Sequence, residues 1–110
     1  MRNAEKPLVW LHGEVKSPPF SRAARLEAGL LLRRLQRNER LALPNSRPMP
    51  AIRLRVHELR VNDEGVTWRI VYRIDRDAVV IVEVFSKKTA STPNRIIDTC
   101  RRRLGEYDHA

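Results

Sequence analysis

Residues 54–85 read LRVHELRVNDEGVTWRIVYRIDRDAVVIVEVF, and this run predicts three consecutive β-strands. Its middle part, Val66 to Ile74, alternates between two sets of side chains, which is the period-two pattern of a strand. The strand before it covers residues 54–61, and residues 62–65 predict a hairpin loop in which Gly65 supplies a positive φ angle. Residues 78–85 are almost continuously apolar, as expected of a strand that is covered on both faces.

An amphipathic helix is predicted before this run. Apolar residues recur there at helical spacing from Phe20 to Leu35, and Leu30 and Leu32 widen the stripe. We expect a helix of about 18 to 20 residues. Ser17 is the expected cap, with Pro18 in the first turn.

A second helix is predicted after the last strand, with Thr92 as its cap and Pro93 at its first position. The residues on its apolar side are Ile96, Ile97, Cys100, Leu104 and Tyr107. A short strand at residues 8–11 and a proline-rich connector at residues 43–50 complete the chain. The expected class is α+β: a small, mostly antiparallel sheet with an N-terminal helix region and a C-terminal helix.

Size and charge narrow the functional classes. The 110 residues suffice for one domain, and 22 Lys plus Arg against 13 Asp plus Glu give a formal charge of +9. Such an excess indicates an anionic partner, and nucleic acid fits better than a membrane because no segment resembles an interfacial or spanning helix. The single cysteine, Cys100, excludes an internal disulfide and is expected in the core. We expect a cytoplasmic protein.

Metal chemistry finds little support, because His12, His57 and His109 are scattered and no carboxylate cluster suggests a metal site. We expect no metal and no cofactor. Cleavage of RNA without a metal stays open, since the ribose 2′-OH supplies its own nucleophile and cations stabilise the charge that develops on the phosphate.

Two groups of cations are candidates for that task. In a simple hairpin, Glu58 faces Arg69 and Arg60 faces Thr67 on one side of the sheet. Either Glu58 and Arg69 form an ordinary cross-strand ion pair, or Glu58 positions Arg69 to hold a phosphate through two hydrogen bonds. The second group is the pair Lys87-Lys88, which precedes hydroxyl-bearing residues and a helix start and could belong to an anion site.

Short motifs give the chain a family resemblance. The segments Glu58-Leu59-Arg60, Trp68-Arg69-Ile70-Val71-Tyr72, Phe85-Ser86-Lys87-Lys88-Thr89 and Thr92-Pro93 resemble the phage-related, HigB-like branch of the RelE/ParE toxin superfamily in order and spacing. The resemblance covers residues 54–107 closely. It implies that residues 1–110 form a single RelE/HigB-like toxin domain.

The resemblance also implies a function and a site. RelE and HigB relatives cleave mRNA on the ribosome without a metal and are neutralised by an antitoxin that often carries a helix-turn-helix domain. Arg69 and Lys88 match positions that stabilise the phosphate. His57 would move protons, because the lysine positions of RelE fall on Val56 and Glu58 here. Tyr107 is the alternative proton carrier, because the catalytic tyrosine of RelE falls near Asn94-Arg95. The expected RNA contacts are Arg60, Lys87, Arg73 and Arg55.

Two alternatives remain. ParE relatives poison DNA gyrase and are not nucleases, so the chain could be a gyrase inhibitor. It could also be an inactive relic that only binds an antitoxin, which would agree with the missing lysines. The expected partners are therefore an antitoxin, mRNA and the ribosome, and no membrane.

Overall fold

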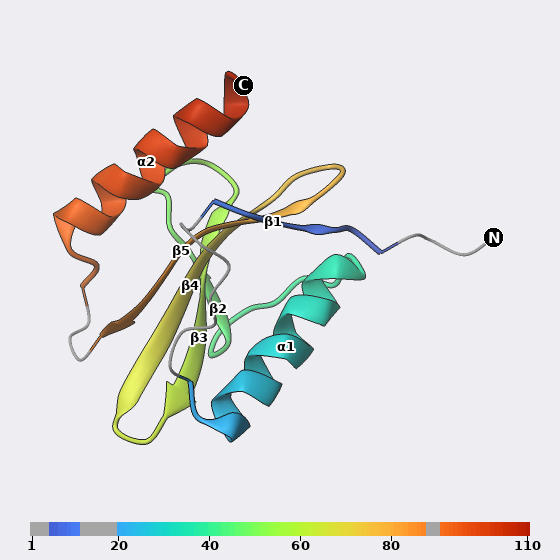
Figure 1. Ribbon diagram of the computed structural model, residues 1–110, viewed down its shortest axis with the longest axis vertical. Coiled ribbons are helices and arrows are strands. Elements are labelled where there is room, and N and C mark those ends of the chain that lie inside the picture. The colour runs from blue at the N-terminus through green and yellow to red at the C-terminus, as the bar shows by residue number, and fades with distance from the viewer. Residues whose placement is uncertain (1–4, 12–19, 88–90) are drawn as a thin grey trace.

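The fold is a five-stranded sheet with one helix on each face (Figure 1). The computed structural model describes residues 5–11, 20–87 and 91–110. The strand order is β1-β5-β4-β3-β2, in which β1 (Leu8–Trp10) runs parallel to β5 (Val79–Lys87) and the other neighbours are antiparallel. The remaining elements are α1 (Arg22–Gln36), β2 (Ser46–Pro48), β3 (Val56–Asp63), β4 (Val66–Ile74) and α2 (Asn94–Asp108). The expected α+β class is thus confirmed.

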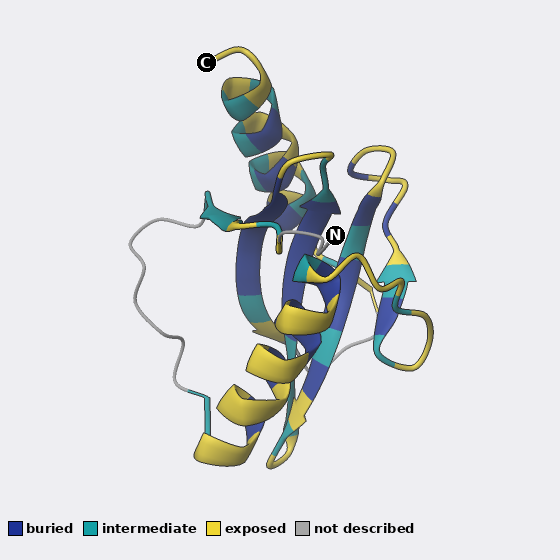
Figure 2. Ribbon diagram, turned by 90° about the vertical axis from the view of Figure 1, so that its right-hand side faces the viewer, coloured by how far each residue is buried: buried dark blue, intermediate teal, exposed yellow. Residues whose placement is uncertain are grey.

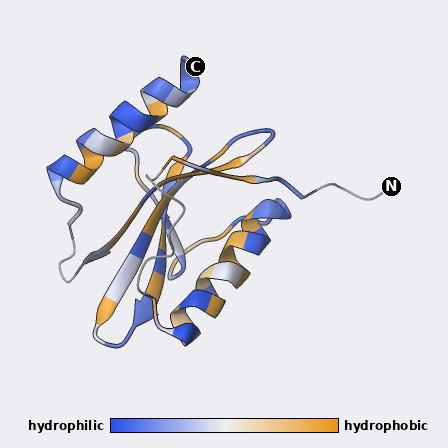
Figure 3. Cartoon of the chain, in the orientation of Figure 1, coloured by the Kyte–Doolittle hydropathy of each residue, from blue (hydrophilic) through white to orange (hydrophobic). Residues whose placement is uncertain are grey.

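The apolar strand β5 lies inside the sheet and is covered on both sides. Val79 and Ile81 belong to the core under α1, whereas Val80 and Val82 belong to the core under α2. All four are fully buried. Figure 3 shows hydrophobic colour along most of β5 and mixed colour on both helices. A continuous apolar run was therefore correctly interpreted as a strand between two layers.

The β3–β4 hairpin is tighter than the sequence suggested. β3 covers Val56–Asp63 rather than the predicted residues 54–61, whereas β4 begins at Val66 as predicted, so the loop is only Glu64-Gly65, with φ angles of 27° and 82°. Two successive residues with positive φ are the geometry that favours two-residue hairpins. As a result Glu58 pairs with Val71, and Arg60 pairs with Arg69, so the predicted register is wrong by two positions. A shift of two leaves every side chain on its expected face.

Helix α1 begins later than predicted. Ser21 is its cap and accepts a hydrogen bond from the Ala24 backbone N–H at 3.1 Å, whereas the predicted cap Ser17 lies outside the described residues. The Ser21 backbone N–H and the Trp68 indole N–H both donate to Asp63, at 2.8 and 3.1 Å. These hydrogen bonds lower the pKa of Asp63, and the one from the Ser21 backbone N–H makes the largest contribution. One carboxylate thus joins the start of α1 to the hairpin.

One residue of α1, Leu30, lies on a different side of the helix from the one predicted. Leu31, Leu32 and Leu35 are buried, but Leu30 is 65% exposed and Leu26 is 62% exposed. At 100° per residue, Leu26 and Leu30 lie opposite the core-facing stripe, and small Ala24 and Ala28 bring the helix close to the sheet. Figure 2 shows this outer side of α1 as almost wholly exposed.

Two other expectations concern α2 and the connector. Thr92 makes no capping hydrogen bond, and Pro93 occupies the cap position. The proline-rich connector contains β2, which pairs with β3 at the edge of the sheet, where a proline is tolerated. Cys100 is buried in the core as predicted, and burial raises its pKa to about 12.

Candidate functional site

Three arginines on neighbouring strands share one face of the sheet with a buried carboxylate. Arg47 lies on β2 opposite Glu58 of β3, and Arg60 of β3 lies opposite Arg69 of β4. Directly opposed residues share a face of the sheet. Because Glu58 is also opposite Val71, which belongs to the core under α2, this is the α2 face of the sheet. Two of these arginines were predicted site residues, and the sheet brings them together.

Glu58 is the centre of this cluster and is 0% exposed. Its Oε1 accepts hydrogen bonds from Arg69 Nη1 at 2.5 Å and Arg47 Nε at 3.2 Å, and its Oε2 accepts one from the Thr92 hydroxyl at 3.4 Å. A buried carboxylate is costly unless it is paired and hydrogen-bonded. The surrounding donors therefore explain how Glu58 is tolerated in the interior.

Arg69 takes a different position from the one expected. The predicted contact with Glu58 is present, but the Arg69 side chain is only 4% exposed. A guanidinium at this depth serves first as the counter-charge of the carboxylate beside it. The idea that Arg69 projects its planar fork from the sheet toward a phosphate is therefore not supported by this geometry.

Arg60 is the accessible cation of the cluster. Its side chain is partly exposed and forms no ion pair with any carboxylate in the described part of the chain. Arg47 is 33% exposed and contacts Glu58 from the sheet edge. Like charges directly opposite each other on a sheet repel. Glu58 compensates Arg69, but Arg60 lacks such a carboxylate, so this face attracts an anion.

Arg47 was missed by sequence reasoning. It lies between Ser46 and Pro48, in a segment whose prolines indicate a connector and whose residues show no strand periodicity. Only the pairing of β2 with β3 places it beside Glu58. The one local signal is a cation in a segment that cannot be a helix, which is too weak to assign a role.

The predicted lysines lie at the end of β5. Lys87 is the last residue of that strand and pairs with Thr67 of β4, two positions from Arg69. Lys88 lies outside the described residues. The expected proximity of Lys88 to Arg69 therefore remains a prediction.

His57, Arg55 and Tyr107 lie away from the arginine cluster. His57 stacks on Tyr72, with ring centroids 5.5 Å apart, on the α1 face of the sheet, and Arg55 lines a pocket with it. Neighbouring residues of a strand point to opposite faces, which separates His57 from Glu58. Tyr107 is on the last turn of α2, roughly 20 Å along the helix from Thr92. Neither predicted proton carrier is near Arg69.

Arg73 is occupied by two carboxylates. It is 5% exposed and donates to Asp75 at 2.8 and 3.0 Å and to Asp108 at 2.9 and 2.7 Å. These hydrogen bonds raise the pKa of Arg73, and those with Asp108 make the largest contribution. The hydrogen bonds from Arg73 in turn lower the pKa of Asp108. Arg73 therefore joins β4 to the end of α2, and its predicted contact with RNA is not compatible with this position.

The remaining electrostatics favour anion binding. Arg47 and Arg69 both contact the Glu58 carboxylate, Arg60 shares their face of the sheet, and Thr92 places the N-terminal end of α2, with its partial positive charge, next to Glu58. Arginine is suited to phosphate because its planar group donates two parallel hydrogen bonds. Within residues 5–11, 20–87 and 91–110, no group of three or more His, Cys, Asp or Glu side chains is arranged to hold a metal ion. The helices described also include none that is long and apolar enough to cross a membrane.

These features define a small, basic α+β protein with arginines gathered on one face of its sheet. The chain belongs to the family described as phage derived protein Gp49-like (DUF891), whose model matches residues 19–105. This family is associated with RelE-type, toxin-like proteins, in keeping with the resemblance seen in the motifs. No curated protein and no solved structure matches the chain.

Proposed function

We propose that the protein is the toxin of a type II toxin–antitoxin system and that it cleaves mRNA on the ribosome without a metal, as HigB-like relatives do. Membership of the Gp49-like family supports the toxin part of this proposal. The observation that carries the RNA part is the pair Arg60 and Arg69, directly opposed on one face, of which Glu58 contacts Arg69 and is not paired with Arg60.

The geometry suggests how the arginines divide the work. Arg60 is the phosphate-binding residue, and Arg47 adds charge at the rim. Arg69 acts through Glu58 as a positioning residue, because the ion pair fixes the carboxylate that also holds Arg47. Cations at a phosphate stabilise the charge of the transition state, while the 2′-OH attacks. Lys87 and Lys88 are the proposed source of further positive charge.

Replacing Arg60 by glutamine tests this assignment. We expect growth inhibition to disappear and mRNA cleavage to fall by about 100-fold, as when one charge-stabilising donor is removed from an active site. The free energy of unfolding should change by no more than about 0.5 kcal/mol, because Arg60 is partly exposed and has no ion pair with a described carboxylate. The measurements are growth after induction, mapping of mRNA ends in the same cells, and thermal unfolding.

The matched control is Arg102→Gln, which removes the same charge from an exposed position on α2 where Arg102 pairs with Glu106. This variant should stay fully toxic. An Arg60→Gln protein that is stable and as toxic as the parent would remove Arg60 from the site. If induction triggers a DNA-damage response before protein synthesis stops, the gyrase-inhibitor alternative replaces the nuclease.

The proposed partner is an antitoxin, and the outer face of α1 is the surface that fits it. Leu26 and Leu30 lie one turn apart and exposed at the centre of this face. Arg22, Arg33 and Arg37 continue the same stripe at both ends. A second copy of the chain would bring these arginines against each other. An amphipathic helix with leucines between acidic residues would bury the apolar centre and neutralise the ends.

Replacing Leu30 by glutamate should prevent neutralisation. A charge placed at the centre of an interface typically weakens the binding free energy by about 2 kcal/mol or more, as at a hot-spot residue. This loss corresponds to a roughly 30-fold lower affinity. We expect cells that express the variant together with the antitoxin to stop growing, while the variant alone stays folded and toxic. Leu54→Glu, at a position that is 83% exposed elsewhere on the surface, is the control and should remain neutralised. Full neutralisation of Leu30→Glu would exclude this face.

A further inference from the structure

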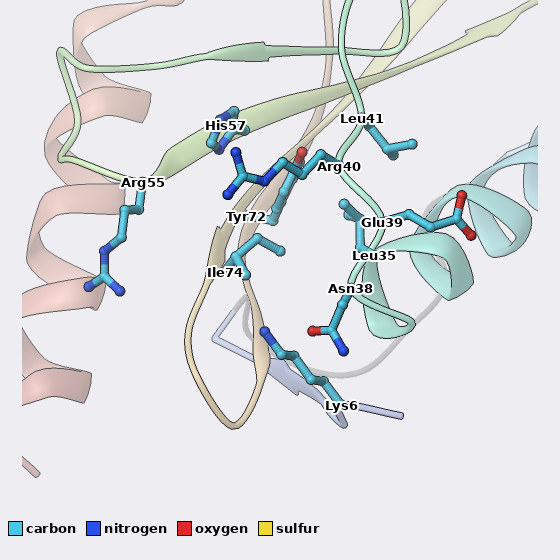
Figure 4. Close-up of a pocket in the computed structure, with 10 residues that line it drawn as sticks. All are labelled: Lys6, Leu35, Asn38, Glu39, Arg40, Leu41, Arg55, His57, Tyr72 and Ile74. Atoms are coloured by element: carbon cyan, nitrogen blue, oxygen red, sulfur yellow. The ribbon is translucent and has the colours of Figure 1, made fainter. Parts of the chain in front are cut away.

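A pocket lies on the other face of the sheet, away from the arginine cluster. It has a volume of about 520 Å³ and lies between the C-terminal end of α1 and the ends of β3 and β4 (Figure 4). Pockets of this size are typical of sites for small molecules. His57 and Tyr72 line it from the sheet, and Arg40 and Asn38 line it from the segment after α1.

Most of the charged residues that line this pocket are cationic. Lys6, Arg40 and Arg55 contribute three positive charges from three separate parts of the chain. Arg40 and Arg55 are exposed and form no ion pair with the carboxylates that the structure describes. The acidic residue at the rim, Glu39, is already paired with Arg34 at 3.0 Å. An anionic ligand would therefore find charge that the protein leaves uncompensated.

The inner part of the pocket suits a flat ring. The His57 ring lies 5.5 Å from the Tyr72 ring with an angle of 20° between their planes. Tyr72 is held in turn by a 2.6 Å hydrogen bond between its hydroxyl and that of Ser46, so the ring pair is well supported. Leu41 and Ile74 line the pocket with apolar side chains. Aromatic and apolar walls of this kind stack against nucleobases in many binding sites.

Two of the three segments that carry the cations, those of Arg40 and Arg55, have an unusual backbone. Asn38 and Arg55 have φ angles of 69° and 65°, in the left-handed region that residues with a Cβ atom rarely adopt. Such conformations cluster at ligand sites, where the surrounding structure holds them in place. Lys6 is also held, because its ammonium group donates to the Asp75 carbonyl at 2.8 Å. The rim is therefore preorganised.

We infer that this pocket binds a nucleoside monophosphate. The phosphate lies at the cationic rim, where Arg40 and Lys6 reach it, and the base lies against His57. The Asn38 side chain offers both a donor and an acceptor to the edge of the base. This inference is independent of the proposed nuclease function, because the two sites lie on opposite faces of the sheet.

Calorimetric titration of the full chain with AMP, GMP, CMP and UMP tests the inference, with inorganic phosphate as a parallel probe. We expect saturable binding of at least one nucleotide below about 1 mM, and weaker binding of phosphate alone. Arg40→Gln should weaken nucleotide binding by about tenfold, since it removes a charge-assisted hydrogen bond. His57→Ala should weaken nucleotides but leave phosphate unchanged.

Two variants serve as controls. Arg102→Gln removes one charge from exposed α2 and should bind like the parent chain. Arg60→Gln, which tests the nuclease proposal, should also keep nucleotide binding, so the two proposals fail separately. The inference is overturned if no nucleotide binds at about 1 mM, if phosphate binds as tightly as every nucleotide, or if Arg40→Gln binds normally.

Discussion

Replacing Glu58 by alanine is expected to destabilise the protein by about 3–5 kcal/mol, the cost of leaving a buried charge without its partner. The carboxylate is fully buried, and the Arg69 side chain beside it is only 4% exposed. Without Glu58, the buried Arg69 guanidinium loses the carboxylate that compensates its charge. Urea unfolding followed by tryptophan fluorescence measures the loss, because Trp68 lies on the same hairpin.

An exposed ion pair provides the comparison for this experiment. Glu106 pairs with Arg102 on the surface of α2, and their side chains are 68% and 61% exposed. Glu106→Ala should therefore cost less than about 0.5 kcal/mol. If Glu58→Ala also costs less than about 1 kcal/mol, Arg69 is able to turn to solvent. The description of Arg69 as a buried positioning residue would then be wrong, and the exposed phosphate clamp expected from the sequence would be favoured again.

Replacing Arg73 by alanine should also destabilise the protein at neutral pH, by about 2–3 kcal/mol, because hydrogen bonds between charged groups are lost. Arg73 is 5% exposed and holds Asp75 and Asp108 through four hydrogen bonds. Its removal leaves two carboxylates facing each other and detaches the end of α2 from β4. Thermal unfolding measures the effect, and Arg102→Ala on exposed α2 is the control, with a change within about 0.5 kcal/mol.

The same variant has a predictable pH dependence. Hydrogen bonds from Arg73 lower the pKa of Asp108 below its ordinary 3.8 in the folded protein. A carboxyl group with a lowered folded pKa stabilises above its unfolded pKa, and this stability is lost as the pH falls toward the folded value. The parent should therefore lose stability below about pH 4, whereas Arg73→Ala should lose less, so that the two curves converge in acid. Curves that stay parallel from about pH 7 to about pH 3 would contradict this role of Arg73.

Much of the fold follows from local patterns in the chain. Alternation predicted β4, a continuous apolar run predicted β5 between two layers, and helical spacing predicted α1 and α2. These predictions succeed because periods of 2 and 3.6 residues state directly which side chains share a face. The same rule correctly placed Glu58, Arg60 and Arg69 on one face, although the register was wrong by two.

The candidate site was predictable only in part. A period assigns a face but says nothing about depth, so the burial of Arg69 depends on tertiary contacts such as its ion pair with Glu58. A periodic pattern also cannot bring distant segments together, and Arg47 joins the cluster only because β2 pairs with β3. His57 was a candidate because the resemblance places the RelE lysines on its neighbours Val56 and Glu58. The alternation that places Glu58 on one face places His57 on the other.

Local sequence thus specifies the elements of this protein, their faces and the excess of positive charge, since these depend on residue types and their spacing along the chain. Which arginine is buried, which leucine of α1 is exposed and which cations share a pocket depend on contacts between segments far apart in the chain. Burial of a charge is a balance between its desolvation and its partners. Because the packing of helices and edge strands supplies those partners, that balance is set in three dimensions.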